Sequence, residues 1–271
     1  MDISNRNSFF EHLGEASLAI CRELRLLVVY AYLISASLFK SLLKPRKIRW
    51  REVIYYMDMC GTDALPIVSL LCLLMGLIMA YQSAFYLHKY GADIELTVLM
   101  GVGVCKELAA LMVAIISTGR AGSAFAAEIG TMKINDEINA LSTMGLSPLR
   151  FLVVPKMLAM IFVSPILTVY GMFAALTGGL IIGTVYLEIS VQNYLQVTID
   201  YLRPVWVYEG MLKGLVYGIL IAAVGCVKGL ESQNDAKGVG KSTTSAVVAS
   251  IFWIVLSNAL ITYLFMKWTG K

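Results

Sequence analysis

The chain has 271 residues, of which 58% are hydrophobic and 15% charged, and its mean hydropathy is +0.74. Ordinary soluble domains hold about 45–50% apolar and about 25% charged residues, so this composition is that of a membrane protein. The formal net charge of +4 does not indicate a nucleic-acid partner, because the basic residues stand in short pieces between apolar segments. The five cysteines are widely spaced and odd in number, which excludes a secreted disulfide scaffold.

The first segment, residues 7–43, differs from the rest of the chain. Its first half is rich in charge, and its second half is apolar but short. This pattern predicts a helix that lies in the membrane interface. A sixth transmembrane helix over residues 24–43 is the alternative. No small-residue cleavage site follows, so we expect no removed signal peptide.

Long apolar stretches predict five membrane spans, because a bilayer core of about 30 Å requires roughly 20 apolar helical residues. Residues 64–87, 157–187 and 242–266 contain no Asp, Glu, Lys or Arg, whereas the second and fourth spans are interrupted by charges. The predicted spans cover about residues 64–88, 96–119, 156–187, 206–228 and 242–266. We therefore expect one all-α transmembrane domain over residues 1–271.

The distribution of basic residues predicts the orientation. Most of the 22 Lys and Arg residues fall in the pieces that are cytoplasmic when the N-terminus is inside. The positive-inside rule then places the C-terminus outside. The largest connection, residues 120–150, becomes cytoplasmic and available to a soluble partner.

Charged side chains inside two predicted spans are costly, at least about 2.5 kcal/mol each at the bilayer centre unless they are paired or hydrated. Glu107 lies in the second span, and Lys213 in the fourth. Lys213 follows Glu209 by four residues, so these two can pair on one helix face. The alternative is that Glu107 and Lys213 face a polar pathway or join helices across the bundle.

The outer half of the first span carries apolar bulk and hydrogen-bonding tips on one face. An aromatic belt at the membrane interface accounts for the tyrosines alone, whereas the whole face suits the wall of a cavity for an amphiphile. The candidate substrate-binding residues are Met79, Gln82, Ser83, Tyr86, Leu87 and Tyr90.

The connection over residues 120–150 contains a predicted amphipathic helix. Asn135 or Asp136 suits its N-cap, and Gly145 suits a left-handed stop. Ile138 and Leu141 share one face, which indicates contact with a partner; packing against the chain's own spans is the alternative. The candidate contact residues are Glu128, Lys133, Asp136, Glu137, Ile138 and Leu141.

The sequence GVGKST over residues 238–243 resembles the end of a phosphate-binding loop. That loop requires glycine where Asp235 stands, and it follows a β-strand. We expect a turn instead, with Ser242, Thr243 or Thr244 capping the last span.

The two histidines lie in separate segments, and neither HExxH nor GxSxG occurs, so we expect no catalytic site, cofactor or metal in this chain. Glycines at helical spacing predict close helix packing; these include Gly179, Gly183, Gly210, Gly214 and Gly218.

Residues 106–150 carry long, specific motifs. They read KELAALMVAIISTGRAGSAFAAEIGTMK and, further on, ALSTMGLSPLR. This run strongly resembles the MlaE (YrbE) family of ABC-transporter permeases, whose pattern is ELGPV, GRxGSAxAAExGTMK and MGxxPxRxLVxPR. The similarity covers roughly residue 64 to the end and includes GVGKSTTSAVV, which resembles the family's GVGxATTxAVV turn. Ala109-Ala110 replace the family's Gly-Pro, which argues against a helix break there, and Asn258 stands where the family usually has an acid, which weakens a proton relay.

The resemblance implies a homodimeric, multi-pass permease of a bacterial inner membrane, with a cytoplasmic N-terminus, a periplasmic C-terminus and a coupling helix between the second and third spans. It implies the movement of phospholipid or a related lipid between that membrane and a periplasmic MCE-domain protein. A small cytoplasmic STAS-like subunit is a further partner in this picture. ATP and magnesium belong to a separate ATPase subunit, because this chain fails the phosphate-loop pattern.

Within this picture, Glu107 and Lys213 are expected to serve the transport cycle, and the contact residues of the 120–150 connection are expected to couple to the ATPase. The alternative function is an ion-coupled secondary transporter that uses Glu107 and Lys213. Five spans give no even inverted repeat, and a large cytoplasmic loop has no evident role in such a carrier. We therefore expect the ABC permease.

Overall fold

The computed structural model describes residues 48–92 and 94–269. The predicted interfacial segment, residues 7–43, lies outside the described residues. Every regular element within the described part is a helix. Five helical stretches there are long and apolar enough to cross a membrane: Trp50–Lys89, Glu95–Ile134, Leu149–Val185, Pro204–Leu230 and Ala236–Lys267. The prediction of an all-α membrane protein is confirmed, and the five predicted spans are all found among the described residues.

The first stretch consists of helix α2 (Trp50–Cys60), a short 3-10 turn (Thr62–Ala64) and helix α3 (Leu65–Lys89). One face of α3 buries small residues at four-residue spacing, and this face packs along α8 (Val154–Val185). A Cβ atom on Gly76 would overlap the backbone carbonyl of Ala175 on α8. Glycine therefore allows the two backbones to approach closely, as in other membrane helix pairs.

The second stretch is helical from Glu95 to Ile134. It comprises α4 (Glu95–Gly103), α5 (Ala109–Ser117) and α6 (Ser123–Ile134), joined by π-helical turns at Val104–Leu108 and Thr118–Gly122. The chain does not break at Ala109-Ala110, because alanine continues the backbone hydrogen bonding that proline would interrupt. Residues 120–134 of the predicted connection are thus a continuation of the second helix.

A short helix, α7 (Glu137–Thr143), follows where the sequence predicts one, and Gly145 ends this segment with a φ of 74°. The predicted side-chain cap is wrong. Asp136 has a φ of 57° and makes no capping hydrogen bond; N-cap residues typically have extended backbone. Its carboxylate instead accepts a hydrogen bond from Asn139 Nδ2 at 2.9 Å. A π-helical turn (Leu149–Val153) then leads into α8.

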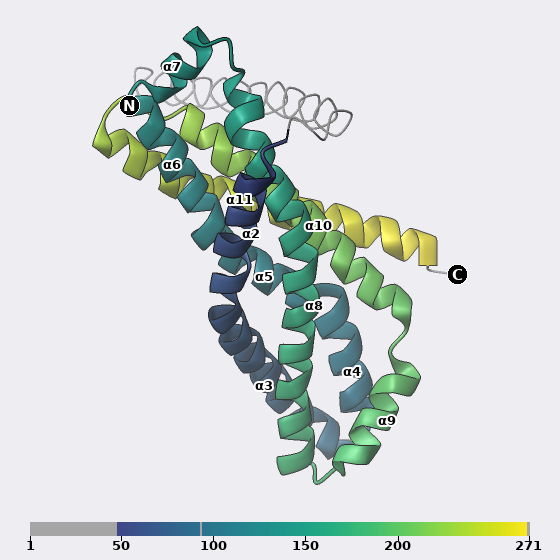
Figure 1. Cartoon of the computed structure of the whole chain (residues 1–271). Coiled ribbons are helices and arrows are strands. Elements are labelled where there is room, and N and C mark those ends of the chain that lie inside the picture. The colour runs from purple at the N-terminus through teal and green to yellow at the C-terminus, as the bar shows by residue number, and fades with distance from the viewer. Residues whose placement is uncertain (1–47, 93, 270–271) are drawn as a thin grey trace, which may run out of the picture. The chain divides into compact units, whose positions relative to one another are not determined.

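Helix α9 (Val191–Tyr201) joins α8 to α10 (Pro204–Leu230) and was not predicted. Ser190 caps it by accepting a hydrogen bond from the Asn193 backbone N–H at 3.2 Å. Figure 1 shows α7 at one end of the helical bundle and α9 at the other. The buried side chain of Tyr194 packs α9 against the bundle. Burial also raises the pKa of Tyr194 to about 12, so its phenol stays neutral at physiological pH.

The last helix, α11 (Ala236–Thr269), begins before the predicted span. Asp235 Oδ1 accepts a hydrogen bond from the Gly238 backbone N–H at 2.8 Å. The prediction that Ser242, Thr243 or Thr244 caps this helix is therefore wrong. All three hydroxyls lie inside the helix and donate to backbone carbonyls of the preceding turn, because Asp235 already serves the first N–H groups.

The glycine row of α10 confirms the predicted close packing. A Cβ atom on Gly210 would overlap the Cys105 carbonyl, and one on Gly214 would overlap the Thr168 hydroxyl of α8. These contacts bring α10 against both the π-helical turn at Val104–Leu108 and α8. The charged residues of the second and fourth stretches consequently meet inside the bundle.

Candidate functional site

Four charged side chains meet between α10 and the π-helical turn at Val104–Leu108. Lys213 Nζ lies 2.5 Å from Glu107 Oε1 and 3.2 Å from Glu209 Oε1. Lys106 Nζ lies 3.5 Å from Glu209 Oε2. We call these four residues the charge network. Two cations and two carboxylates alternate in it, so the formal charges cancel.

The local geometry explains why these residues converge. Glu209 and Lys213 are one turn apart on α10, so they share a face. Lys106 and Glu107 are neighbours in sequence, and the π-helical turn presents both to α10. Such turns are frequent at functional sites because they interrupt regular side-chain spacing. The same-helix pair and the cross-bundle pair, weighed above as alternatives, are both present.

Helix α11 completes the charge network. Thr262 Oγ1 accepts a hydrogen bond from Lys213 Nζ at 2.8 Å and donates one to Glu107 Oε1 at 2.9 Å. One turn earlier, Asn258 accepts a hydrogen bond from the Tyr217 hydroxyl at 2.7 Å. Sequence reasoning did not include Thr262 or Tyr217. The four-residue spacing of Asn258 and Thr262, two polar residues on one face of an apolar helix, was the available signal.

Burial in the charge network is uneven. The side chains of Lys213 and Glu209 are 0% and 2% exposed, whereas those of Lys106 and Glu107 are 20% and 30% exposed. Within the described part of the chain, Glu107 Oε2 has no hydrogen-bond partner. Buried charges are tolerated when they are paired and hydrogen-bonded. The network therefore joins three helical stretches, with the two α10 side chains enclosed and the two side chains of the π-helical turn partly exposed.

A second polar cluster joins α2, α6 and α8 toward the α7 end. Lys156 Nζ lies 2.8 Å from the Tyr56 hydroxyl and 3.0 Å from Glu128 Oε1, and the hydroxyl donates to the same carboxylate oxygen at 2.5 Å. The ammonium group also lies 4.2 Å from the centre of the Tyr56 ring, a cation–π contact. Glu128, a candidate contact residue, is thus paired inside the chain.

Lys133, another candidate contact residue, also serves an internal contact. Its ammonium group donates hydrogen bonds to the carbonyls of Leu230 and Ser232, both at 2.7 Å. The carbonyls at a helix C-terminus are unpaired within the helix and favour cations. Lys133 therefore fastens the end of α6 to the end of α10.

The remaining candidate contact residues lie on or beside α7. Asp136 and Glu137 are exposed and Ile138 is half-buried, whereas Leu141 is 7% exposed. Leu141 thus packs inside the chain, which is the alternative considered for this face. The exposed apolar residues of this segment come just after α7: Met144 is 65% exposed and Leu146 is 43% exposed.

The candidate substrate-binding residues lie at the α9 end of α3. Gln82, Tyr86 and Tyr90 are exposed, and Met79, Ser83 and Leu87 are half-buried. They are separate from the small residues that α3 buries against α8. This surface, which we call the α3 stripe, is open in the single chain, and its role in substrate binding stays a prediction.

Comparison with known proteins identifies the family. The family described as permease MlaE matches residues 53–264, which include the charge network and α7. A probable ABC transporter permease protein of Synechocystis is 35% identical over 252 residues, 90% of this chain and 92% of that protein. One from Rickettsia prowazekii is 34% identical over 87% of this chain and 90% of its own length. The chloroplastic protein TRIGALACTOSYLDIACYLGLYCEROL 1 of Arabidopsis thaliana is 28% identical over 83% of this chain and 64% of its own length. The resemblance drawn from the motifs is thereby confirmed: this chain belongs to the MlaE family of ABC transporter permeases.

Proposed function

We propose that this chain is the membrane-spanning subunit of an ATP-driven transporter that moves phospholipid or a related lipid. Membership in the permease family carries the proposal. The Arabidopsis relative bears the name of a galactolipid, which supports a lipid substrate. The α3 stripe supports it as well, because apolar side chains beside hydroxyl and amide groups suit a molecule with an acyl chain and a polar head.

The proposed complex is a homodimer in a bacterial inner membrane. A second copy would cover the α3 stripe and form a cavity with it. The α7 end faces the cytoplasm in this arrangement and meets a separate ATPase that binds ATP and magnesium. The opposite end, with α9, faces the periplasm and an MCE-domain partner. A small STAS-like subunit is a further cytoplasmic partner.

The chain's own contacts suggest how movement would pass through it. An ATPase that pulls on α7 acts directly on α6 and α8. The Tyr56–Glu128–Lys156 cluster carries that displacement to α2, and Lys133 carries it to the end of α10. The charge network lies farther along the same helices and couples α10 to α11. Movement at one end thus reaches the helices that border the proposed lipid path.

The test is reconstitution of the full chain, co-purified with its ATPase, in proteoliposomes that contain a fluorescent phospholipid. We expect lipid transfer to an acceptor that requires ATP and stops with a non-hydrolysable analogue. Co-purified ATPase without lipid transfer would retain the permease role and overturn the lipid substrate.

The second candidate is an ion-coupled secondary transporter. The observation that favours it is Glu107 Oε2, a buried carboxylate oxygen without a partner among the described residues, which is available to a proton or cation. Transport driven by a pH or sodium gradient in the absence of ATP would support this candidate. The charge network favours the first proposal. Its ion pairs cancel in charge and join the second and fourth spans, so the charges in these two spans are explained by helix packing without an ion-coupled step.

A further inference from the structure

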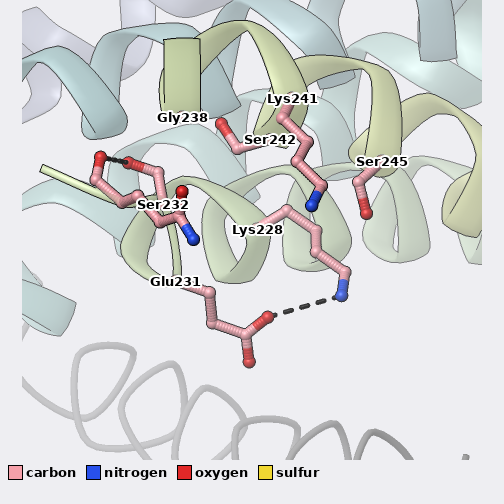
Figure 2. Close-up of a pocket in the computed structure, with 8 residues that line it drawn as sticks. Lys228, Glu231, Ser232, Gly238, Lys241, Ser242 and Ser245 are labelled. Carbon is pink, nitrogen blue, oxygen red and sulfur yellow. Dashed lines mark hydrogen bonds and ion pairs between the residues drawn. The ribbon is translucent and has the colours of Figure 1, made fainter. Parts of the chain in front are cut away.

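The corner between α10 and α11 contains a polar pocket of about 190 Å³. Figure 2 shows Lys228 from the last turn of α10 and Lys241 from the second turn of α11 extending toward the same opening, with Ser245 beside it. Glu231, Ser232 and Ser242 also line the pocket. This is the region of the phosphate-loop-like sequence, which the function proposed above does not use.

The charge of this pocket favours an anion. Two lysines and one glutamate line it, so cationic side chains outnumber anionic ones among the lining residues. Lys228 pairs with Glu231 at 3.4 Å. No ion pair of Lys241 is found within the part of the chain that the structure describes. The lysines, rather than the helix end, supply the positive charge, because Asp235 already occupies the first N–H groups of α11.

The position of the pocket along the helices selects the kind of anion. Residues 214–227, before Lys228, and residues 242–266, after Lys241, contain no Asp, Glu, Lys or Arg. Both lysines therefore stand where the charge-free part of a spanning helix ends. That level holds lipid headgroups in a bilayer, and basic pockets between membrane helices bind anionic headgroups there.

We infer that this pocket binds the phosphate group of an anionic phospholipid, with Lys228 and Lys241 as its charged ligands and Ser245 beside them. The site is distinct from the α3 stripe, which lies toward the α9 end of the bundle. It adjoins Ser232, whose carbonyl accepts a hydrogen bond from Lys133. A bound headgroup would therefore stabilise the α10–α11 corner where it contacts α6. The inference goes beyond the proposed transport function and requires only that α10 and α11 cross a membrane.

The experiment measures lipid binding to the purified full-length chain in detergent by native mass spectrometry, with phosphatidylglycerol and phosphatidylcholine as the two probes. The variants are Lys228→Gln, Lys241→Gln and their combination. The matched control is Lys237→Gln, an exposed lysine in the first turn of α11 that does not line the pocket. Lys241 is itself exposed, so Lys241→Gln tests the site even if the double variant fails to fold.

We expect the wild-type chain to prefer phosphatidylglycerol and each pocket variant to bind it roughly five-fold more weakly, while Lys237→Gln binds as the wild type does. Equal weakening by Lys237→Gln and Lys241→Gln would overturn the site, because the effect would then be general surface charge. Displacement of the lipid by millimolar inorganic phosphate would overturn the lipid assignment in favour of free phosphate. Unchanged lipid binding in the variants, with loss of the co-purifying ATPase, would identify a protein contact instead. None of these outcomes depends on lipid transfer, so failure of this inference and failure of the proposed function are distinguishable.

Discussion

Lys213 and Glu107 are 106 residues apart in sequence, yet the ammonium nitrogen lies 2.5 Å from a carboxylate oxygen. Thr262 bonds to both partners, so a third helix depends on this pair. The charge on Lys213 is fully enclosed, and the charge on Glu107 is partly open. This asymmetry determines which substitutions the bundle tolerates.

Replacement of Lys213 by Met leaves Glu107 and Glu209 without their shared cation. We expect a loss of about 3–5 kcal/mol of stability, as when one partner of a buried ion pair is removed, together with loss of lipid transfer. Thermal unfolding in detergent and the proteoliposome assay measure the two effects. The matched variant is Lys213→Met with Glu209→Gln, which restores neutrality. Full transfer by that double variant would show that the charges serve packing alone.

The Tyr56–Glu128–Lys156 cluster predicts an unequal response to the loss of either charge. Lys156 is 0% exposed, whereas the Glu128 side chain is 39% exposed. Glu128→Gln leaves the buried Lys156 ammonium group without its carboxylate partner and should lower the free energy of unfolding by about 3 kcal/mol. Lys156→Met leaves a carboxylate that water can reach, and should cost about 1 kcal/mol. Thermal unfolding of the two variants side by side measures the difference, and the reverse order would contradict this account of the cluster.

Gly76 should not tolerate a methyl group. A Cβ atom there overlaps the backbone of Ala175, which has no rotamer to change, so Gly76→Ala should cost about 1–3 kcal/mol through overpacking. Gly240 is the control, because a Cβ atom on it meets nothing within 4 Å and it lies inside α11. Gly240→Ala should be neutral or stabilising by up to about 1 kcal/mol. Equal unfolding temperatures for the two variants would mean that α3 and α8 are less closely packed.

The α3 stripe should capture lipid. A photo-crosslinker at Tyr86 or Leu87 is expected to label phospholipid in native membranes during ATP-driven transfer. Tyr81 is the control, because it lies on the same helix but contacts the Tyr186 ring, with the ring centres 5.4 Å apart. Equal labelling at positions 81 and 86 would reduce the stripe to ordinary bilayer contact.

The ATPase is expected to contact the exposed residues that follow α7. Met144→Asp combined with Leu146→Asp should leave insertion intact and remove the co-purifying ATPase, since both side chains are exposed. Ile138→Asp with Leu141→Asp is less discriminating, because Leu141 is buried and its substitution also perturbs folding. Tyr201→Asp, exposed on α9 at the opposite end, is the control and should keep the ATPase. Retention of the ATPase by the Met144/Leu146 variant would move the contact elsewhere, to the basic run over residues 40–51.

The features that depend on local order could be predicted from the sequence. Apolar stretches of bilayer length, three of them free of charge and two interrupted by charged pairs, identify the five spanning stretches. Gly145 identifies the end of α7, because helix length and backbone conformation are determined by neighbouring residues. The motifs over residues 106–150 identify the family in the same way. The extension of the second helix to Ile134 was not predicted, since a charge within a helix marks the end of an apolar run but does not end the helix.

The partners of the charged side chains were decided by the tertiary structure alone. Glu128 and Lys133 belong to the most recognisable motif of the chain, and both make internal contacts, with Lys156 of α8 and with the end of α10. Nothing in the local sequence separates an acid that meets a partner protein from one that meets a lysine 28 residues away. Helix spacing states which face a side chain occupies. What that face meets depends on how closely the small residues of α3 and the glycine row of α10 allow the helices to approach. That is settled only when the five spanning stretches of the described residues pack together.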